Sequence, residues 1–409
     1  MTELPEGWRQ VTLADVCEYV RGVTYDKSDA TNKPTQGFLP LLRATNIEER
    51  RIVLSDFVFI PESKVKPVQF LGRGDLLMAA SSGSIQVVGK SGPAPEGFSG
   101  TFGAFCAVLR PSTGSNHQFL EYFISSPAVR EAWSVAARGT NINNLKRESV
   151  LGTLMPLPSV AEQRRIVEIL EEQFSRLDSA LASIRVVREK STALRRSLLH
   201  SAFSGQLTGG TKDWTDCTFG QVAKIASNLV SPEGFGSFPH LAPNHIEAQT
   251  GRLLELATVA EDGVTSPKHR FFAGQIVYSK IRPYLNKVVL VDFDGLCSAD
   301  MYPIETQQDP KWLHYKMLSS EFVASVCGSQ NRTVLPKTNV RDLSAVRVVV
   351  PPIIEQERMV EILDEQFSRL DNAMQIVNEL EARIASERRS LLHAAFTGRL
   401  TAKWRELYV

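Results

Sequence analysis

The chain has 409 residues, too many for one ordinary domain, so we expect two or more hydrophobic cores. It is 43% hydrophobic and 22% charged, the balance of a soluble globular protein, and its formal net charge of +1 neither requires nor excludes nucleic acid. The sequence lacks a membrane-length apolar run and a signal-peptide pattern, and its five cysteines are scattered without a CxxC pair, so a cytoplasmic chain with reduced thiols is expected.

Residues 1–157 contain short apolar runs separated by polar turns. The segments "LPLLRATNIEE" (39–49) and "GRGDLLMAA" (72–80) each contain one short apolar strand. The later segment "FLEYFISSPAV" (119–129) has the spacing of an amphipathic helix. Short strands followed by a late helix predict an α+β domain.

The apolar run that ends at residue 80 is followed by "SSGSIQVVGKSG" (81–92), which is close to a phosphate-binding loop. That loop needs a glycine, four residues and then Gly-Lys-Ser/Thr, because successive backbone N–H groups must converge on one phosphate. Here Ser84 occupies the required glycine position, and Gly83 stands one residue too early. We therefore expect a polar loop after a strand, and not a nucleotide cradle.

Residues 158–208 are predicted to form one long helix. Proline favours the first turn of a helix, and Pro158 stands at the start, while Gly205 stands where a C-terminal cap is expected. A coiled-coil seam with steps of three and four residues is formed by Phe174, Leu177, Leu181 and Ile184. A helix of about 44 residues would be roughly 66 Å long and could not bury this seam alone.

The second half of the chain repeats the first. The segment at 161–184 recurs as "IEQERMVEILDEQFSRLDNAMQIV" (354–377), and "RRSLLHSAFSGQLT" (195–208) recurs at 388–401, both at an offset of 193 residues. The second helix lies within residues 351–409, and its seam is Phe367, Leu370, Met374 and Val377. Two helices of equal length with matching seams predict an antiparallel pair, either as a structural element alone or also as a docking surface for another protein.

Residues 209–350 form a second globular unit that keeps only the skeleton of the first. After each helix comes a tryptophan segment: "DWTDCTFGQV" (213–222), which resembles "GWRQVTLADV" (7–16), and the closing "AKWRELYV". A chain that ends by beginning its repeat again predicts a pseudo-two-fold cyclic arrangement, with the C-terminal tail near the N-terminus.

This layout resembles the specificity subunit of type I restriction–modification systems. The resemblance is carried by the repeated "EQ…IVEIL…QFSRLD" and "SLLHxAFxGxLT" helices and by the closing "KWRE". The first unit looks like the N-terminal target-recognition domain of the K-12-type enzyme of Escherichia coli, through "RGVTY" (21–25), "FGAFCAVLRP" (102–111) and "GTNINNLK" (139–146).

The resemblance implies an α+β fold in which two α/β target-recognition domains, 1–157 and 209–350, are separated by the two conserved helices. It implies a non-catalytic subunit with two recognition domains. Each domain would read one half of a bipartite, asymmetric site in double-stranded DNA. The helices would set the spacing and dock two methyltransferase subunits that methylate adenine. With motor-nuclease subunits added, the complex could also cut DNA. S-adenosylmethionine, ATP and Mg are then expected on partner subunits, with no cofactor on this chain.

Base reading requires side chains that reach base edges in the major groove, such as Arg or Lys at guanine and Asn or Gln at adenine. The candidates in the first unit are Arg21, Tyr25, Lys27, Arg43, Asn46, Ser81, Ser82, Ser84, Lys90, Asn141, Asn143, Asn144 and Lys146. Those in the second unit are Asn244, His245, Lys268, Lys280, Arg282, Tyr284, Asn286, Lys287, Arg332, Lys337 and Asn339. The 81–90 and 280–287 loops are favoured, because both copies place polar and basic side chains directly after the same strand. Each residue could also be a solvated loop side chain, and asparagine is common in turns.

Catalytic motifs are absent from the sequence. The seven histidines lack metal-ligand spacing, and there is no Asn/Asp-Pro-Pro-Tyr/Phe or GxSxG motif. One alternative is a coiled-coil scaffold that binds proteins through its two globular units. Another is a P-loop hydrolase, but the matching loop of the second unit, "SKIRPYLNKVV" (279–289), has no Gly-Lys-Ser.

Overall fold

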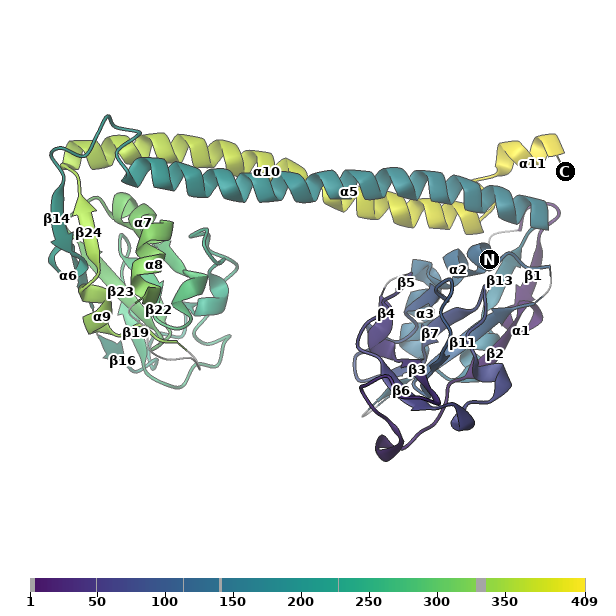
Figure 1. The fold of residues 1–409 in the computed structure, drawn as a ribbon. Helices are drawn as coiled ribbons and strands as arrows, with labels where there is room; N and C mark the ends of the chain where they lie inside the picture. Colours follow the sequence, from purple (N-terminus) through teal and green to yellow (C-terminus); the bar gives the residue numbers. More distant parts are fainter. Residues whose placement is uncertain are drawn as a thin grey trace. The chain divides into compact units, whose positions relative to one another are not determined.

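The computed structural model describes residues 4–48, 50–112, 114–139, 142–226, 228–328 and 336–408 (Figure 1). The chain divides into two compact units. Unit 1 comprises residues 1–183 and 379–409, and unit 2 comprises residues 184–378. Each unit therefore contains one globular domain together with part of each long helix.

The globular domain of unit 1 is built around a four-stranded antiparallel sheet. Its order is β2 (Cys17–Arg21), β11 (Cys106–Pro111), β7 (Leu76–Ala79) and β9 (Ser91–Pro93). A second sheet has the order β10 (Thr101–Phe102), β3 (Phe38–Leu42) and β6 (Val58–Pro61). Three two-stranded ribbons complete it: β1 (Arg9–Thr12) with β13 (Leu154–Leu157), β4 (Ile47–Glu48) with β5 (Arg51–Ile52), and β8 (Ser81–Ser82) with β12 (Asn143–Asn144). The helices are α1 (Leu13–Val16), α2 (His117–Ile124), α3 (Pro127–Ala136) and α4 (Arg147–Leu151).

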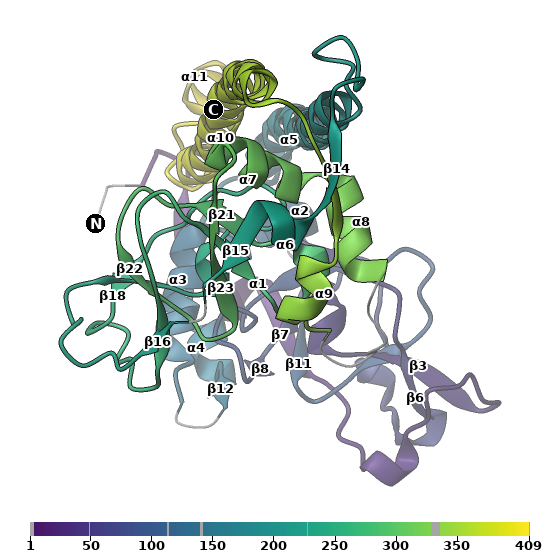
Figure 2. The same cartoon turned by 90° about the vertical axis from the view of Figure 1, so that its left-hand side faces the viewer.

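The globular domain of unit 2 has the same central sheet. Its order is β15 (Ala223–Ile225), β23 (Met301–Thr306), β20 (Ile276–Ser279) and β21 (Val288–Leu290). A five-stranded sheet contains β16 (Leu229–Val230), β19 (Lys268–Phe271), β22 (Gly295–Cys297), β17 (Pro239–Leu241) and β18 (Ala257–Thr258). The ribbon of β14 (Thr215–Thr218) and β24 (Arg347–Val350) matches β1–β13. The helices are α6 (Phe219–Val222), α7 (Pro310–Leu318), α8 (Ser320–Gly328) and α9 (Val340–Ser344), as Figure 2 shows.

The central strands are buried on both faces, which explains their unbroken apolar runs. Along β7, Leu76 and Met78 belong to one hydrophobic core, whereas Leu77 and Ala79 belong to another. Successive side chains of a strand point to opposite faces, so this alternation places one core on each side of the sheet. In β20, Ile276 and Val277 divide in the same way.

The long helices α5 (Val160–Phe203) and α10 (Ile353–Phe396) have 44 residues each. In unit 1, Arg388 donates to the carboxylate of Asp178. In unit 2, Arg188 donates to Asn378 at 2.7 Å and Arg195 to Asp371. The partners follow opposite directions along the two helices, so the pair is antiparallel. The seam residues face inward: Phe174, Ile184, Phe367 and Val377 are buried, and Leu177, Leu181, Leu370 and Met374 are half-buried.

The two helices also complete the cores of the domains. In unit 1, Leu170 and Phe174 of α5 and Leu392 of α10 share a core with Leu76 and Trp133. After α10, the short helix α11 (Ala402–Tyr408) places Arg405 over the ring of Trp8, 5.4 Å from its centroid. The described elements form the predicted α+β fold, with the same central sheet in both globular domains and one long helix after each.

Candidate nucleic-acid interface

Two candidate segments of unit 1 that are far apart in sequence meet in the β8–β12 ribbon. Ser81 pairs with Asn144 and Ser82 with Asn143. The hydroxyl of Ser81 donates to Asn144 Oδ1, and Asn143 Nδ2 donates to the carbonyl of Gly83 at 3.2 Å. Residues 81–82 and 143–144 therefore belong to one element, and the loop that follows Ser82 contains exposed Ser84. A two-stranded ribbon is one of the elements that the major groove admits.

Unit 2 repeats this pairing with different side chains. Ile281 forms an antiparallel bridge with Lys337, at the positions that correspond to Ser81 and Asn144. The N–H of Thr338 donates to the carbonyl of Lys280 at 2.8 Å, and that of Arg282 donates to Pro336 at 2.9 Å. The two domains thus present the same backbone element and divergent side chains, which suits two readers of different sequences.

The turn after β20 is strained at two non-glycine residues. Arg282 has φ of 48° and Asn286 has φ of 43°, on either side of the 3₁₀ turn Pro283–Leu285. Such a left-handed conformation is costly for arginine and less so for asparagine, and strained residues cluster at functional sites. Arg282 is exposed and Tyr284 is 51% exposed, so both are available to a ligand.

Several candidates have side chains that serve the fold instead. Asn46 is 2% exposed, and its amide donates to the carbonyls of Val53 and Ser55. Asn286 is 2% exposed and donates to the carbonyl of Met317 at 3.0 Å. Lys268 is 9% exposed, and its ammonium donates to Ser266 Oγ at 2.6 Å. These three side chains lie in the interior of this conformation and not on a surface that could face a duplex.

Other candidate side chains already form hydrogen bonds or ion pairs within their own domain. The ammonium groups of Lys280 and Lys287 donate to the carbonyls of Ala299 and Pro243, both at 2.6 Å. His245 Nδ1 accepts from the N–H of Ala242, and Asn339 caps α9 by accepting from Asp342. Arg43 Nη2 donates to the carbonyl of Asp56 at 2.8 Å. Lys337 Nζ forms an ion pair with Asp300 Oδ1 at 3.3 Å. These side chains would have to exchange a partner to contact DNA.

The remaining candidates are open or undescribed. Arg21, Lys27, Asn244 and Lys146 are exposed, and Tyr25 is half-buried. Asn141 and Arg332 lie outside the described residues.

The sequence did not single out Phe105, which is 63% exposed beside the β8–β12 ribbon, where its carbonyl accepts from the N–H of Ser81 at 3.0 Å. An exposed aromatic side chain could contact a thymine methyl group. Its sequence signal was hidden because "FGAFCAVL" looks like one buried run.

The described residues contain no group of three or more histidine, cysteine or acidic side chains that could hold a metal ion. Burial raises the pKa of the Cys17, Cys106 and Cys297 thiols to about 12, so none of the three is an activated nucleophile. Burial lowers the pKa of His314 to about 4. Within the same described part of the chain, no helix is long and apolar enough to cross a membrane.

Comparison with known proteins gives a consistent result. Residues 5–181 match the type I restriction modification DNA specificity domain. The chain is 37% identical over 297 residues to the type I restriction enzyme EcoDI specificity subunit of Escherichia coli, covering 66% of this chain and 67% of that protein. It is 28% identical to the EcoKI specificity subunit of Escherichia coli K12 over 98% of this chain and 91% of that protein.

Solved structures share the fold. A chain from a study of complex assembly and conformational transition of the type I R-M system matches with a TM-score of 0.74 at 19% identity, covering 98% of this chain and 100% of that one. The HsdS subunit from Thermoanaerobacter tengcongensis matches with a TM-score of 0.51 at 19% identity, over 97% of this chain and 98% of that one.

Proposed function

Because this chain belongs to the family of type I restriction enzyme specificity subunits, we propose that its two globular domains each read one half of a bipartite site in double-stranded DNA. The observation that carries the proposal is the repeated ribbon. Ser81 opposite Asn144 and Ile281 opposite Lys337 occupy the same place on two similar sheets. Their side chains differ completely, so each domain offers its own set of donors and acceptors.

The chemistry of the ribbon suits base reading. Asparagine and serine side chains can pair with base edges, and Arg282 carries the fork of donors that guanine accepts. The hydrogen bonds between Ser81, Asn143 and the opposite strand hold the first ribbon in one shape before DNA arrives. A rigid reader loses less conformational entropy on binding than a flexible loop does.

The same proposal assigns the long helices and the partners. The helices α5 and α10 would fix the gap between the half-sites and dock two methyltransferase subunits. Those subunits would hold S-adenosylmethionine and methylate adenine. Motor-nuclease subunits, where present, would hold ATP and Mg. On this account the chain itself contributes recognition and supplies no catalytic group.

A binding selection tests the proposal. The chain is reconstituted with its methyltransferase subunits and exposed to a library of random duplexes at moderate salt. We expect enrichment of two short half-sites at one fixed spacing. A complex that enriches no sequence, or that enriches a single continuous one, would contradict two-domain reading. The competing scaffold function predicts no enrichment at all.

A further inference from the structure

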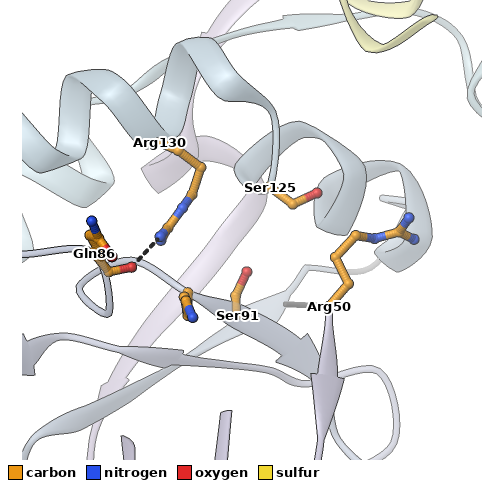
Figure 3. Close-up of a pocket in the computed structure, with 6 residues that line it drawn as sticks. Arg50, Gln86, Ser91, Ser125 and Arg130 are labelled. Carbon is orange, nitrogen blue, oxygen red and sulfur yellow. Dashed lines mark hydrogen bonds between the residues drawn. The ribbon is translucent and has the colours of Figure 1, made fainter. Parts of the chain in front are cut away.

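A small polar pocket lies beside the ribbon in unit 1 (Figure 3). It has a volume of about 200 Å³ and is lined by Arg50, Gln86, Lys90, Ser91, Ser125 and Arg130. Three of these six residues are cations. The volume is below the roughly 300 Å³ at which pockets for drug-sized ligands begin, so it suits a small anion rather than a whole nucleotide.

The buried hydroxyl of Ser91 lacks a partner. Ser91 is 3% exposed, and its Oγ makes no hydrogen bond to any residue that the structure describes. In Figure 3 the hydroxyl points into the pocket, between Arg130 on one side and Ser125 on the other. A buried polar group without a partner destabilises a fold, so its presence requires an explanation.

One of the cations, Arg130, is held in place beside the pocket by its own hydrogen bonds. Arg130 donates to the carbonyls of Val88 at 2.9 Å and Gln86 at 3.3 Å. Gly89 has a φ of 77°, which favours glycine, and a Cβ there would stand 2.6 Å from Arg130 Nη1, so the guanidinium would have to shift. The ammonium of Lys90 has no hydrogen-bond or ion-pair partner among the described residues.

The third cation, Arg50, occupies a strained position. It is a non-glycine residue with φ of 58°, and its N–H donates to the carbonyl of Ser91 at 3.0 Å. Its guanidinium lies 3.8 Å from the ring centroid of Tyr122, and its Nε is 3.0 Å from Glu121 Oε1. That carboxylate offsets one of the three positive charges, so the lining keeps an excess of positive charge.

The duplication supplies an internal control. The strand register places Ser91 opposite Met78 and Val288 opposite Tyr278, so Ser91 corresponds to Val288. The offset of 193 residues, which also relates α2 to α7 and α3 to α8, matches Ser125 with Leu318 and Arg130 with Val323. Val288 and Leu318 belong to the hydrophobic core of unit 2. The fold thus forms with apolar residues at these positions, so the polar pocket is not required for folding.

We propose that the pocket formed by Arg50, Lys90, Ser91, Ser125 and Arg130 binds one phosphate group. Arginine and lysine are the side chains that hold phosphates, and the Ser91 hydroxyl can donate to a phosphate oxygen. Binding is through side chains: Gly89, Lys90 and Ser91 resemble the end of a phosphate loop in sequence, but Ser91 begins strand β9 and not a helix.

The group has two possible sources, a phosphodiester of bound DNA or free inorganic phosphate. Ser82, in the ribbon, and Gln86, at the pocket, are four residues apart in one loop, which favours a backbone phosphate next to the first half-site. This choice of source rests on the proposed function. A phosphate contact would fix the register of the domain on the duplex without reading sequence.

The test compares Ser91→Ala, Lys90→Gln and the control Arg51→Ala in the complex with methyltransferase subunits. Arg51 is an exposed neighbour that pairs with Glu48 outside the pocket. Duplex affinity is measured over a salt series, on specific and random duplexes. We expect that Ser91→Ala does not lower the melting temperature, because the Ser91 hydroxyl has no partner to lose. The same variant should weaken binding to both duplexes about tenfold. Lys90→Gln should reduce the salt slope by about 0.9. The control should behave as the parent chain.

A second arm titrates inorganic phosphate without DNA and follows the melting temperature. If phosphate stabilises the parent but not Ser91→Ala, while duplex affinity is unchanged, the pocket takes free phosphate. If Ser91→Ala and Lys90→Gln match the control in both arms, the pocket does not bind phosphate. A changed base preference at the first half-site would also overturn the proposal, since it would mean base reading. If the parent complex selects no DNA sequence, the proposed function fails. The titration with inorganic phosphate then still shows whether the pocket binds phosphate.

Discussion

Glu162 and Arg405, 243 positions apart in the chain, form an ion pair between a buried carboxylate and a half-buried guanidinium, and it joins the start of α5 to the C-terminal helix. Glu162 Oε1 accepts from Arg405 Nη2 at 2.8 Å, and Glu162 Oε2 accepts from Trp8 Nε1 at 2.9 Å. Thr401 donates to the same carboxylate at 2.7 Å. One side chain thus ties together the N-terminal segment, the first long helix and the C-terminal tail, all within unit 1.

Arg405→Ala should destabilise unit 1 strongly. Removing Arg405 leaves the buried Glu162 carboxylate without its counter-charge, which costs about 3–5 kcal/mol. Hydrogen exchange of the full chain would show the loss as faster exchange around residues 160–175, with unit 2 unaffected. Lys403→Ala, a neighbouring exposed cation, is the matched control. Equal exchange in the two variants would mean that the pair does not hold the tail.

The equivalent carboxylate of the second repeat should matter less. Glu355 accepts from Thr208, as Glu162 does from Thr401, but the indole N–H of Trp214 is buried with no partner among the described residues. We expect Glu355→Gln to cost about 1 kcal/mol, as for one ordinary hydrogen bond, and Glu162→Gln to cost clearly more. Urea unfolding of both variants measures the difference. The reverse order would contradict the contacts described.

Unit 2 should lose stability in mild acid because of His314. Burial keeps this imidazole neutral down to about pH 4, although the ordinary histidine pKa is 6.5. Between these values the unfolded chain binds a proton that the folded chain does not, so stability falls as the pH is lowered. The loss is roughly 3 kcal/mol over that range. Lys311 adds to the lowering, while Asp364 and a backbone hydrogen bond to Val288 oppose it.

His314→Leu should remove most of this pH dependence. Some slope remains, because burial also lowers the pKa of His269, with Lys280 contributing in the same direction. The measurement is the urea midpoint of unit 2 as the pH is lowered from neutral towards about 4. If His314→Leu keeps the full pH dependence of stability seen in the parent chain, another titratable group causes the effect.

Arg282→Gly should separate recognition from stability. Glycine adopts φ of 48° without strain, so unfolding should cost no less free energy than in the parent chain. Discrimination at the second half-site should fall by about 1–3 kcal/mol, and the first half-site should be unaffected. Gln249→Gly, also at positive φ, is the control that relieves backbone strain without removing the arginine. Loss of both half-sites would indicate misfolding rather than lost reading.

Deleting one heptad from each long helix should change only the distance between the two half-sites. Residues 182–188 and 375–381 are equivalent in the repeat, and seven residues of helix span roughly 10 Å. That length corresponds to about three base pairs at 3.4 Å each. Selection from random duplexes should return the same two half-sites with a shorter gap. Changed half-sites at the original gap would show that the helices are not the spacer.

The helices and the repeat were predictable because a long seam has a regular sequence signal. Phe174 and Phe367 recur at the same offset as the segments around them, and the structure buries both. The meeting of the two halves of the ribbon was not predictable, because Ser81 and Asn144 are separated by 63 residues and pair only through the fold.

Single contact residues were harder still. Asn46 and Asn144 both follow the pattern of a polar residue near an apolar run, yet one is buried and holds a loop while the other is exposed on the ribbon. An amide that satisfies buried carbonyls and one that faces solvent have the same local sequence signal. The pocket was hidden for a similar reason, since Arg50 and Arg130 come together only in three dimensions.

The central claim is that two different domains of this chain direct modification to one bipartite site. Methylation-state sequencing of a host genome, with and without the gene for this chain and with the partner genes present, tests it most directly. The account predicts that methylated adenines within a single asymmetric motif of two half-sites at fixed spacing disappear when the gene is removed. Unchanged methylation, or the loss of a motif with only one continuous half, would contradict it.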